Sequence, residues 1–390
     1  MADSGYTLFD TAIGPCGMAW NAAGVTGVQL PELTPAATLA RLAGRFPALT
    51  EGSPRGAARQ ARDAMCAHLD GRSRDLATIP LDLAGVSTFR REVYAAARRI
   101  PPGRTVTYGE LAARVGAPQA ARAIGQAMGN NPCPIIVPCH RVLAAGGRAG
   151  GFSAAGGATT KAYILRIEGA RDVAFEGFGY DPLEAIAHLR AADARLAAVI
   201  ERIGPPKIEL RHTSSIFLAL ARAIVYQQLS GKAAATIFGR VCALFPRGER
   251  DFNARNLLAI PAPQLRGAGL SNNKLLALTD LAERTLAGEV PTLAQLRQMD
   301  DEAVIEALTR VRGIGRWTVE MMLMFRLGRA DVMAVDDLGL RQGHAIIVGR
   351  SGETERKTLA AYAERWRPYR SVASWYLWRA VELAREQPRP

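Results

Sequence analysis

The chain has 390 residues, of which 48% are hydrophobic and 22% charged, a composition typical of soluble globular proteins and a length beyond what one core usually serves. Its 49 lysines and arginines against 36 acidic residues give a formal charge of +13, which favours a polyanionic partner, with nucleic acid ahead of an anionic membrane surface. The start lacks the features of a signal peptide and no apolar run is long enough to cross a bilayer, so we expect a cytoplasmic protein with no membrane partner.

Residues 1–85 are rich in Ala, Gly and Pro and carry weak patterns, which we interpret as a small α/β region. From Val86 onward the pattern is stronger. The segment STFRREVYAAARRI has Ser87 as a plausible N-cap and ends at PPG, and its apolar residues recur at helical spacing: Phe89, Val93, Ala97 and Ile100. A helix is therefore predicted here.

Two short helices are predicted next, from TYGELAARVG and PQAARAIGQAMG, joined at residues 116–118 with Pro118 opening the second helix. This spacing is typical of a helix-turn-helix, in which the second helix usually enters a DNA groove. Arg122 would lie near the N-terminal end of that helix. An ordinary pair of packed helices explains the segment about as well when it is taken alone.

The polar, Gly-containing stretch GARDVAFEGFGYDP predicts a linker over residues 171–182. Beyond it nearly every segment has helical periodicity, and no strand-like alternation persists. The predicted fold is therefore multi-domain: an α/β subdomain over 1–85, a helix-turn-helix subdomain over 86–170, the linker, and an all-α domain over 183–390.

The segment NNPCPIIVPCHRVL presents Cys139 beside His140. A thiol reacts as its thiolate, so His140 and Arg141 are candidates for lowering the pKa of Cys139, and Glu168 is a candidate for orienting His140. A Cys-His pair alone is more often a packed cysteine. The five cysteines show no C-x-x-C pair and no zinc spacing, which argues against disulfides and against a metal site: Cys16, Cys66, Cys133, Cys139 and Cys242.

The surrounding sequence, from TVTYGEL through PCHRVL to GGFS, closely resembles the O6-alkylguanine-DNA alkyltransferase family over about residues 86–170. The resemblance implies irreversible transfer of an alkyl group from guanine O6 to Cys139, without a cofactor. It also implies that His140 removes the thiol proton through a water, that Glu168 orients His140, and that Asn131 supports the active-site turn. Cys16 and Cys66 are expected to be structural.

The same resemblance implies a DNA-binding face, because O6 of a stacked guanine cannot meet a buried thiolate unless the base is flipped out. Tyr108 would lie near the flipped base and its phosphate, and Arg122 would fill the gap in the stack. Phe152, where the family more often has Tyr, and Ser153 would line the base pocket. Arg141 is expected among the residues that bind the DNA.

The segment LTRVRGIGRWTVEMML predicts two helices joined by a glycine turn, in which Gly313 and Gly315 would let the backbone approach a phosphate. A simple helix connection is an equally good explanation of this turn alone. Downstream, VMAVDDLGLRQG supplies Asp336 and Asp337 at a break in the apolar pattern. Adjacent acids are usually a solvated cap or turn.

Together, the hairpin and the aspartates resemble the helix-hairpin-helix base-excision glycosylases over about residues 185–385, and YQQLSGKAA and WRPYRSVASWYLWRA narrow the resemblance to the 3-methyladenine glycosylase II branch. It implies that Asp337 is the catalytic carboxylate and that Asp336 caps or positions. Bifunctional members place a lysine where this chain has Trp317, so we expect a monofunctional glycosylase. The resemblance also assigns a wedge to fill the hole in the duplex and aromatic groups to hold the base: Gln228 as the wedge, Trp317 and Trp378 as pocket walls, and Tyr226 and Trp375 as further neighbours.

The combined prediction is a nucleoid-associated, bifunctional repair protein for alkylated double-stranded DNA, in which both segments act on alkylated bases; the sequence leaves the oligomeric state open, with a monomer favoured. The alternative is an alkylation sensor or regulator in which one site is inactive.

Overall fold

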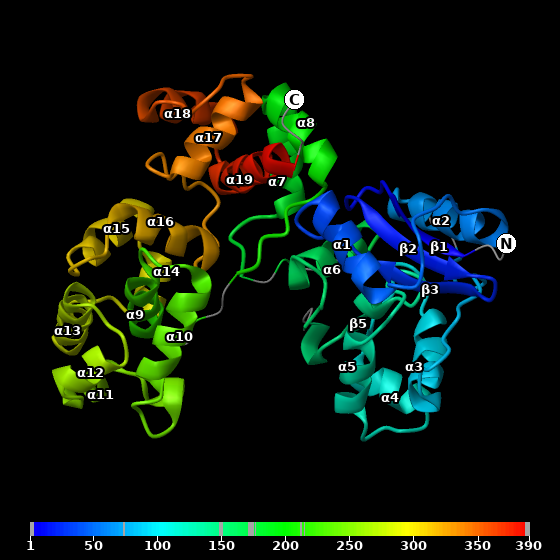
Figure 1. The fold of residues 1–390 in the computed structure, drawn as a ribbon, viewed down its shortest axis with the longest axis horizontal. Helices are drawn as coiled ribbons and strands as arrows, with labels where there is room; N and C mark the ends of the chain where they lie inside the picture. The colour runs from blue at the N-terminus through cyan, green and yellow to red at the C-terminus, as the bar shows by residue number, and fades with distance from the viewer. Residues whose placement is uncertain are drawn as a thin grey trace. The chain divides into compact units, whose positions relative to one another are not determined.

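The computed structural model describes residues 4–72, 75–147, 151–170, 175, 177–210, 213 and 215–386, and it separates into two compact units. The first unit contains Met1–Glu209 together with Leu338–Pro390, and the second contains Leu210–Asp337. The architecture is mostly helical with a small N-terminal sheet (Figure 1). The boundaries of these units do not coincide with the linker predicted at residues 171–182. The domain boundaries proposed from the sequence therefore stay predictions.

The first unit begins with an antiparallel sheet of three strands in the order β1-β2-β3: β1 (Gly5–Phe9), β2 (Cys16–Asn21) and β3 (Gly24–Gln29). Helix α1 (Pro35–Arg45), which the Thr34 side chain caps, packs against all three strands, and α2 (Gly56–Leu69) packs against β3. The expected α/β character of this region is therefore present.

The helix-turn-helix follows: α3 (Thr88–Arg98), β4 (Val106–Thr107), α4 (Tyr108–Arg114) and α5 (Ala121–Gly129). A capping box between Thr107 and Glu110 fixes the start of α4. The second helix begins at Ala121 and not at Pro118. The proline therefore lies in the preceding turn, where its fixed φ is tolerated and its missing N–H removes no helical hydrogen bond. This corrects the predicted start of that helix.

The segment that carries Cys139 follows these helices and ends in a short strand. Cys139–Arg141 form a 3-10 turn, β5 (Val142–Leu143) pairs in parallel with β4, a further 3-10 turn covers Ala145–Gly147, and α6 (Gly157–Ile167) packs beside the Cys139 turn. One apolar core joins the N-terminal sheet to these elements, and it contains Met18, Trp20, Tyr94, Ile124 and Val137. The cysteine turn is therefore built on buried, rigid structure.

Five further helices belong to the first unit although they lie beyond the predicted linker: α7 (Pro182–Ala192), α8 (Ala194–Ile203), α17 (Leu338–Ile347), α18 (Arg356–Ala363) and α19 (Arg370–Glu386), with a 3-10 turn at Glu364–Trp366. Part of the expected linker is packed, since the ring of Tyr180 lies 6.0 Å from that of Tyr369 and Asp181 caps α7. Its residues 171–174 and 176 lie outside the described residues.

The second unit is built from helices: α9 (Ile216–Tyr226), α10 (Gly231–Cys242), α11 (Ala254–Ala259), α12 (Ala262–Gly267), α13 (Asn272–Leu286), α14 (Leu293–Gln298), α15 (Asp301–Thr309) and α16 (Arg316–Phe325), with a 3-10 turn at Gly248–Asp251. From residue 177 onward the described part of the chain contains no strand, as the helical periodicity predicted. Among the described residues, no helix combines the length and apolar character that a membrane span requires.

Candidate active sites

The turn that presents Cys139 is held by the side chain of Asn131. Its amide nitrogen donates to the Val137 carbonyl at 2.8 Å, and its amide oxygen accepts from the Cys133 backbone at 3.0 Å. Between them, Ile135 is buried with a φ of 74°, a conformation that β-branched residues rarely adopt. Asn131 thus has the geometry of a side chain that supports this turn.

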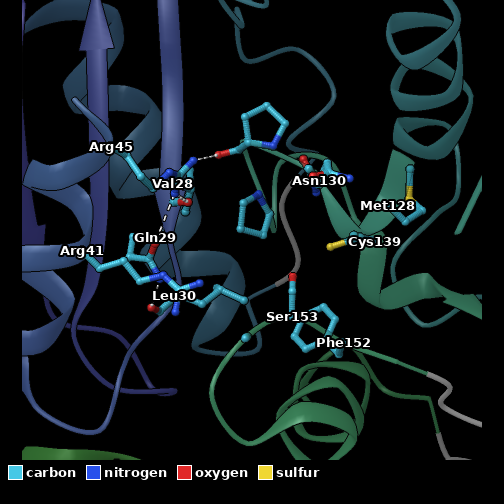
Figure 2. A pocket seen from close by; sticks show the side chains of 15 residues that line it. Val28, Gln29, Leu30, Arg41, Arg45, Met128, Asn130, Cys139, Phe152 and Ser153 are labelled. Atoms are coloured by element: carbon cyan, nitrogen blue, oxygen red, sulfur yellow. Dashed lines mark hydrogen bonds between the residues drawn. The ribbon is translucent and has the colours of Figure 1, made fainter. Parts of the chain in front are cut away.

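Cys139 lies at a cavity of about 280 Å³ between the N-terminal sheet and the helix-turn-helix segment. Figure 2 shows the sulfur facing this cavity, with Phe152 and Ser153 on one side and Arg41 and Arg45 on another. The predicted pocket residues Phe152 and Ser153 therefore share a cavity with the cysteine. The remaining lining comes from Val28, Gln29, Leu30, Met128, Gly129, Asn130, Asn131, Pro132, Pro134 and Ala154.

Burial raises the pKa of the Cys139 thiol above its ordinary value, although a hydrogen bond with Asn131 and the positive charge of Lys161 act in the opposite direction. Of the two residues expected to help lower this pKa, His140 contributes through a backbone hydrogen bond, but the net pKa stays above its ordinary value in the resting protein. Because the thiol is only 6% exposed, desolvation outweighs the nearby charges. The nucleophile is therefore stored as a thiol and needs a base.

Glu168 forms the centre of a buried cluster directly behind the cysteine. Its Oε1 lies 2.8 Å from the Nε2 atoms of both His140 and His68, and Arg141 binds both carboxylate oxygens, at 2.7 and 2.9 Å. The Gly103 backbone donates to Oε2 at 3.3 Å. Burial alone would raise the pKa of Glu168, but the hydrogen bonds that it accepts from His140, His68 and Arg141 hold it well below its ordinary value.

His140 has one ring nitrogen that is free to accept a proton. Because its Nε2 donates to the ionised Glu168, the neutral ring carries its lone pair on Nδ1. That atom is buried and has no hydrogen-bond partner among the described protein atoms. Burial lowers the pKa of His140, against the raising effect of Glu168, so the ring is neutral and ready to accept a proton near neutral pH.

Two members of this cluster differ from the sequence-based expectation. Arg141 is 5% exposed, and its guanidinium binds Glu168 and the Ile100 carbonyl, so the expected contact with DNA is replaced by an internal one. His68, on α2, was not predicted. No local pattern marks it, because its partner Glu168 lies 100 residues away in the chain.

Tyr108, the first residue of α4, lies close to Lys161 of α6. The Lys161 ammonium is fully buried, donates to the Val142 carbonyl at 2.6 Å, and lies 5.8 Å from the centre of the half-buried Tyr108 ring. Lys161 is a second residue that the motif analysis did not assign. Arg122 is exposed on the first turn of α5, where a side chain can reach a ligand outside the protein.

The glycine hairpin of the second unit is held by side chains from the C-terminal end of α9 and from α13. Gly313 has a φ of 77°, and its carbonyl accepts from Gln227 at 2.8 Å. Asp280 accepts from the Arg312 backbone at 2.8 Å, and Lys274 donates to the Gln227 carbonyl at 2.9 Å. The hairpin is thus rigid, while Gly315 opens α16 without a capping side chain, as an anion-binding helix start requires.

Trp317 and Asp337 meet at the start of α16. The indole nitrogen of Trp317 donates to Asp337 Oδ2 at 2.8 Å, and the Trp317 side chain is 46% exposed. Asp336 is exposed beside them. The predicted catalytic carboxylate and one predicted pocket wall are therefore in direct contact at an open surface.

The other residues assigned to this site are placed as follows. Tyr226 is half-buried, with Arg222 3.1 Å from its hydroxyl, and Gln228 is exposed with a φ of 58° in the α9–α10 turn. Trp375 and Trp378 lie on α19 in the first unit, with Trp375 only 5% exposed. An aromatic pocket that combines Trp317 with Trp378 stays a prediction.

Comparisons with known proteins match these two sites separately. The family model described as "6-O-methylguanine DNA methyltransferase, DNA binding domain" matches residues 88–170, and the model for the HhH-GPD superfamily of base excision DNA repair proteins matches residues 221–368. DNA-3-methyladenine glycosylase 1 of Schizosaccharomyces pombe is 36% identical over 165 residues, which cover 42% of this chain and 72% of the relative. A methylated-DNA–protein-cysteine methyltransferase of Mycobacterium tuberculosis is 37% identical over 167 residues, which cover 43% of this chain and 93% of the relative.

Among solved structures, a DNA-3-methyladenine glycosidase from Bacillus halodurans is 35% identical, with a TM-score of 0.48 and coverage of 53% of this chain and 93% of that one. The cysteine cavity and the hairpin carboxylate, each inside a matched segment, define a fusion of two DNA repair modules. The chain belongs to the methylated-DNA–protein-cysteine methyltransferases through its first part and to the HhH-GPD base excision repair superfamily through its second. Both predicted resemblances are confirmed.

Proposed function

We propose that this protein repairs alkylated double-stranded DNA in two ways, by accepting the O6-alkyl group of guanine on Cys139 and by excising N-alkylated purines with Asp337. The observation that carries the proposal is the buried chain of contacts from Glu168 to His140 beside a cysteine that opens onto a cavity. The names of the relatives on both halves support it.

In the first reaction the Cys139 thiol passes its proton to the free Nδ1 of His140, through a water, and Glu168 stabilises the imidazolium that forms. The sulfur then attacks the alkyl carbon, and the electron pair of the broken C–O bond stays on guanine, which regains a proton. The thioether that results has no route back to a thiol. Each protein molecule therefore accepts one alkyl group.

The cavity at Cys139 requires that the base leave the helix, since a buried sulfur cannot reach a stacked guanine. Phe152 offers a face for stacking and Ser153 a hydroxyl for an edge contact. The absence of a phenol hydroxyl at Phe152 affects which alkyl groups are accepted. Exposed Arg122 fills the space that the flipped base leaves.

In the second reaction Asp337 stabilises the positive charge that develops on the sugar as the base departs and assists the attack of water. An N-alkylated purine is already cationic, so it leaves readily and stacks well on an electron-rich indole such as Trp317. No lysine nucleophile stands at this position, so the strand is not cleaved. The open start of α16 and the hairpin amides bind the DNA backbone.

The decisive experiment uses duplex DNA treated with a radiolabelled methylating agent, incubated with native protein, Cys139→Ala and Asp337→Asn. We expect Cys139→Ala to lose labelling of the protein only, and Asp337→Asn to lose release of free 3-methyladenine or 7-methylguanine by about 100-fold or more. If native protein releases no base, the second segment is a DNA-binding platform for Cys139. If it takes up no label, the sensor or regulator alternative gains.

A further inference from the structure

Residues 203–208, between α8 and the second unit, are buried in the first unit, and we name this segment the clasp. Each of its six residues is buried, including Lys207, which is 6% exposed. By sequence the clasp belongs to the glycosylase segment, since it follows α7 and α8. Its contacts, however, are with the alkyl-acceptor segment.

The first contact is a close approach of two backbones. A Cβ atom on Gly204 would lie 2.6 Å from the Gly14 nitrogen, and one on Gly14 would lie 2.6 Å from the Ile203 carbonyl oxygen. Both glycines have positive φ, 80° and 102°. Only glycine satisfies the spacing and the backbone conformation at this crossing. On its other side, the Gly204 carbonyl accepts from the Tyr376 hydroxyl of α19 at 2.9 Å.

The second contact is made by Lys207. Its ammonium donates to the Glu32 carbonyl at 2.8 Å, which ties the clasp to the segment between β3 and α1. The titratable groups that act on the Lys207 pKa are Cys16 and Glu32 on the acceptor side and Arg379 on α19. Burial lowers the pKa of Lys207 to about 8, as expected for an ammonium group enclosed between packed elements.

The third contact reaches α6, the helix that carries Lys161. The Thr159 hydroxyl donates to the Ile208 carbonyl at 3.0 Å, and a Cβ on Gly156 would lie 2.9 Å from the Lys207 Cα atom. Both residues belong to the first turn of α6 or its N-cap. The clasp therefore packs on the start of the helix that carries Lys161, whose positive charge lowers the pKa of the Cys139 thiol.

We propose that the alkyl-acceptor segment is not an autonomous domain, and that the clasp completes it by joining its N-terminal sheet to α6. The partner of this acceptor surface is the chain's own glycosylase segment. The clasp spans from Gly14 and Glu32 on one side to Thr159 on the other, so it links the N-terminal sheet, which lines the Cys139 cavity, to α6, which follows the lining residues 152–154 in the chain. Opening the clasp loosens the sheet edge and the start of α6 together.

The test uses the full chain and the native cysteines as reporters. In Gly204→Val the added side chain cannot fit against Gly14. The matched control Gly352→Val changes a glycine of similar φ, 81°, at which an added Cβ would have no neighbour within 4 Å. Alkylation by iodoacetamide is followed cysteine by cysteine with mass spectrometry. We expect Cys16, 1% exposed and two residues from Gly14, to react about tenfold faster in Gly204→Val than in the control.

Hydrogen exchange over residues 156–162 should accelerate in the same variant, while Cys242 in the second unit keeps its rate. Equal Cys16 rates in Gly204→Val and Gly352→Val would overturn the proposal. If Gly204→Val unfolds the whole unit, Lys207→Glu replaces it, with exposed Lys357→Glu as its control. We expect about threefold or greater acceleration at Cys16 in Lys207→Glu, and no difference from Lys357→Glu would contradict the clasp.

Discussion

The two candidate sites of this protein differ most in how they treat charge. In the first unit, the side chain of Glu168 is fully buried and contacts His140, His68 and Arg141, and the reactive thiol is buried at a cavity. In the second, Asp337 contacts a Trp317 side chain that is 46% exposed. A thiol that must lose its proton before it attacks the flipped DNA base needs a proton acceptor already in place within the folded protein. A carboxylate that stabilises a developing cation can be enclosed by the substrate itself.

The largest effect should come from breaking the buried cluster. Glu168→Ala leaves three buried polar or charged side chains without their common acceptor, so we expect a loss of about 3–5 kcal/mol in the free energy of unfolding. The matched control is Glu306→Ala, which removes a solvent-exposed partner of Arg310 and should cost under about 1 kcal/mol. Urea unfolding of both variants measures the difference. Similar losses in the two would show that the Glu168 carboxylate is not buried in the folded protein.

The cluster also predicts how stability responds to acid. Burial lowers the pKa of His140, against the raising effect of Glu168 and with contributions from Arg141 and His68, so between its folded pKa and about 6.5 the unfolded chain binds the additional proton. Stability is then lost as the pH falls below about 6.5. We expect the loss between about pH 7.5 and 5.5 to be smaller in His140→Gln than in native protein, as measured by urea unfolding at both pH values. Identical pH slopes would contradict a neutral, buried His140.

The site around Cys139 shows what could be predicted from the sequence. Cys139, His140 and Glu168 follow from a motif and its spacing, and the structure places His140 and Glu168 in contact. His68 was missed because a contact across 100 residues leaves no local periodicity, and Lys161 was missed because none of the motifs assigns it a role. The direction of the Cys139 pKa was mispredicted, since adjacent basic residues can be counted in a sequence whereas desolvation depends on the fold.

The open site predicts a catalytic loss without a structural one. Trp317→Phe keeps an aromatic face but removes the indole nitrogen that donates to Asp337, so we expect base release to fall about tenfold. Because Trp317 is largely solvent-exposed, unfolding should change by less than about 0.5 kcal/mol. Alkyl transfer to Cys139 in the same preparation is the internal control. A loss of both activities would mean that Trp317 supports the fold and not the chemistry.

The smallest effect separates the two glycines of the hairpin. Gly313 needs its positive φ, so Gly313→Ala should cost about 1–2 kcal/mol in the free energy of unfolding. Gly315 has ordinary backbone angles and open space where a Cβ would stand, and serine is a good N-cap, so Gly315→Ser should leave stability unchanged. If the hairpin backbone touches DNA phosphate at Gly315, the added side chain still weakens binding to undamaged duplex by about threefold to tenfold in a fluorescence-anisotropy titration. Unchanged affinity in Gly315→Ser would show that the phosphate contact is not made at this turn. A backbone in close contact with a DNA phosphate leaves no room for an added side chain, so a substitution there must weaken binding.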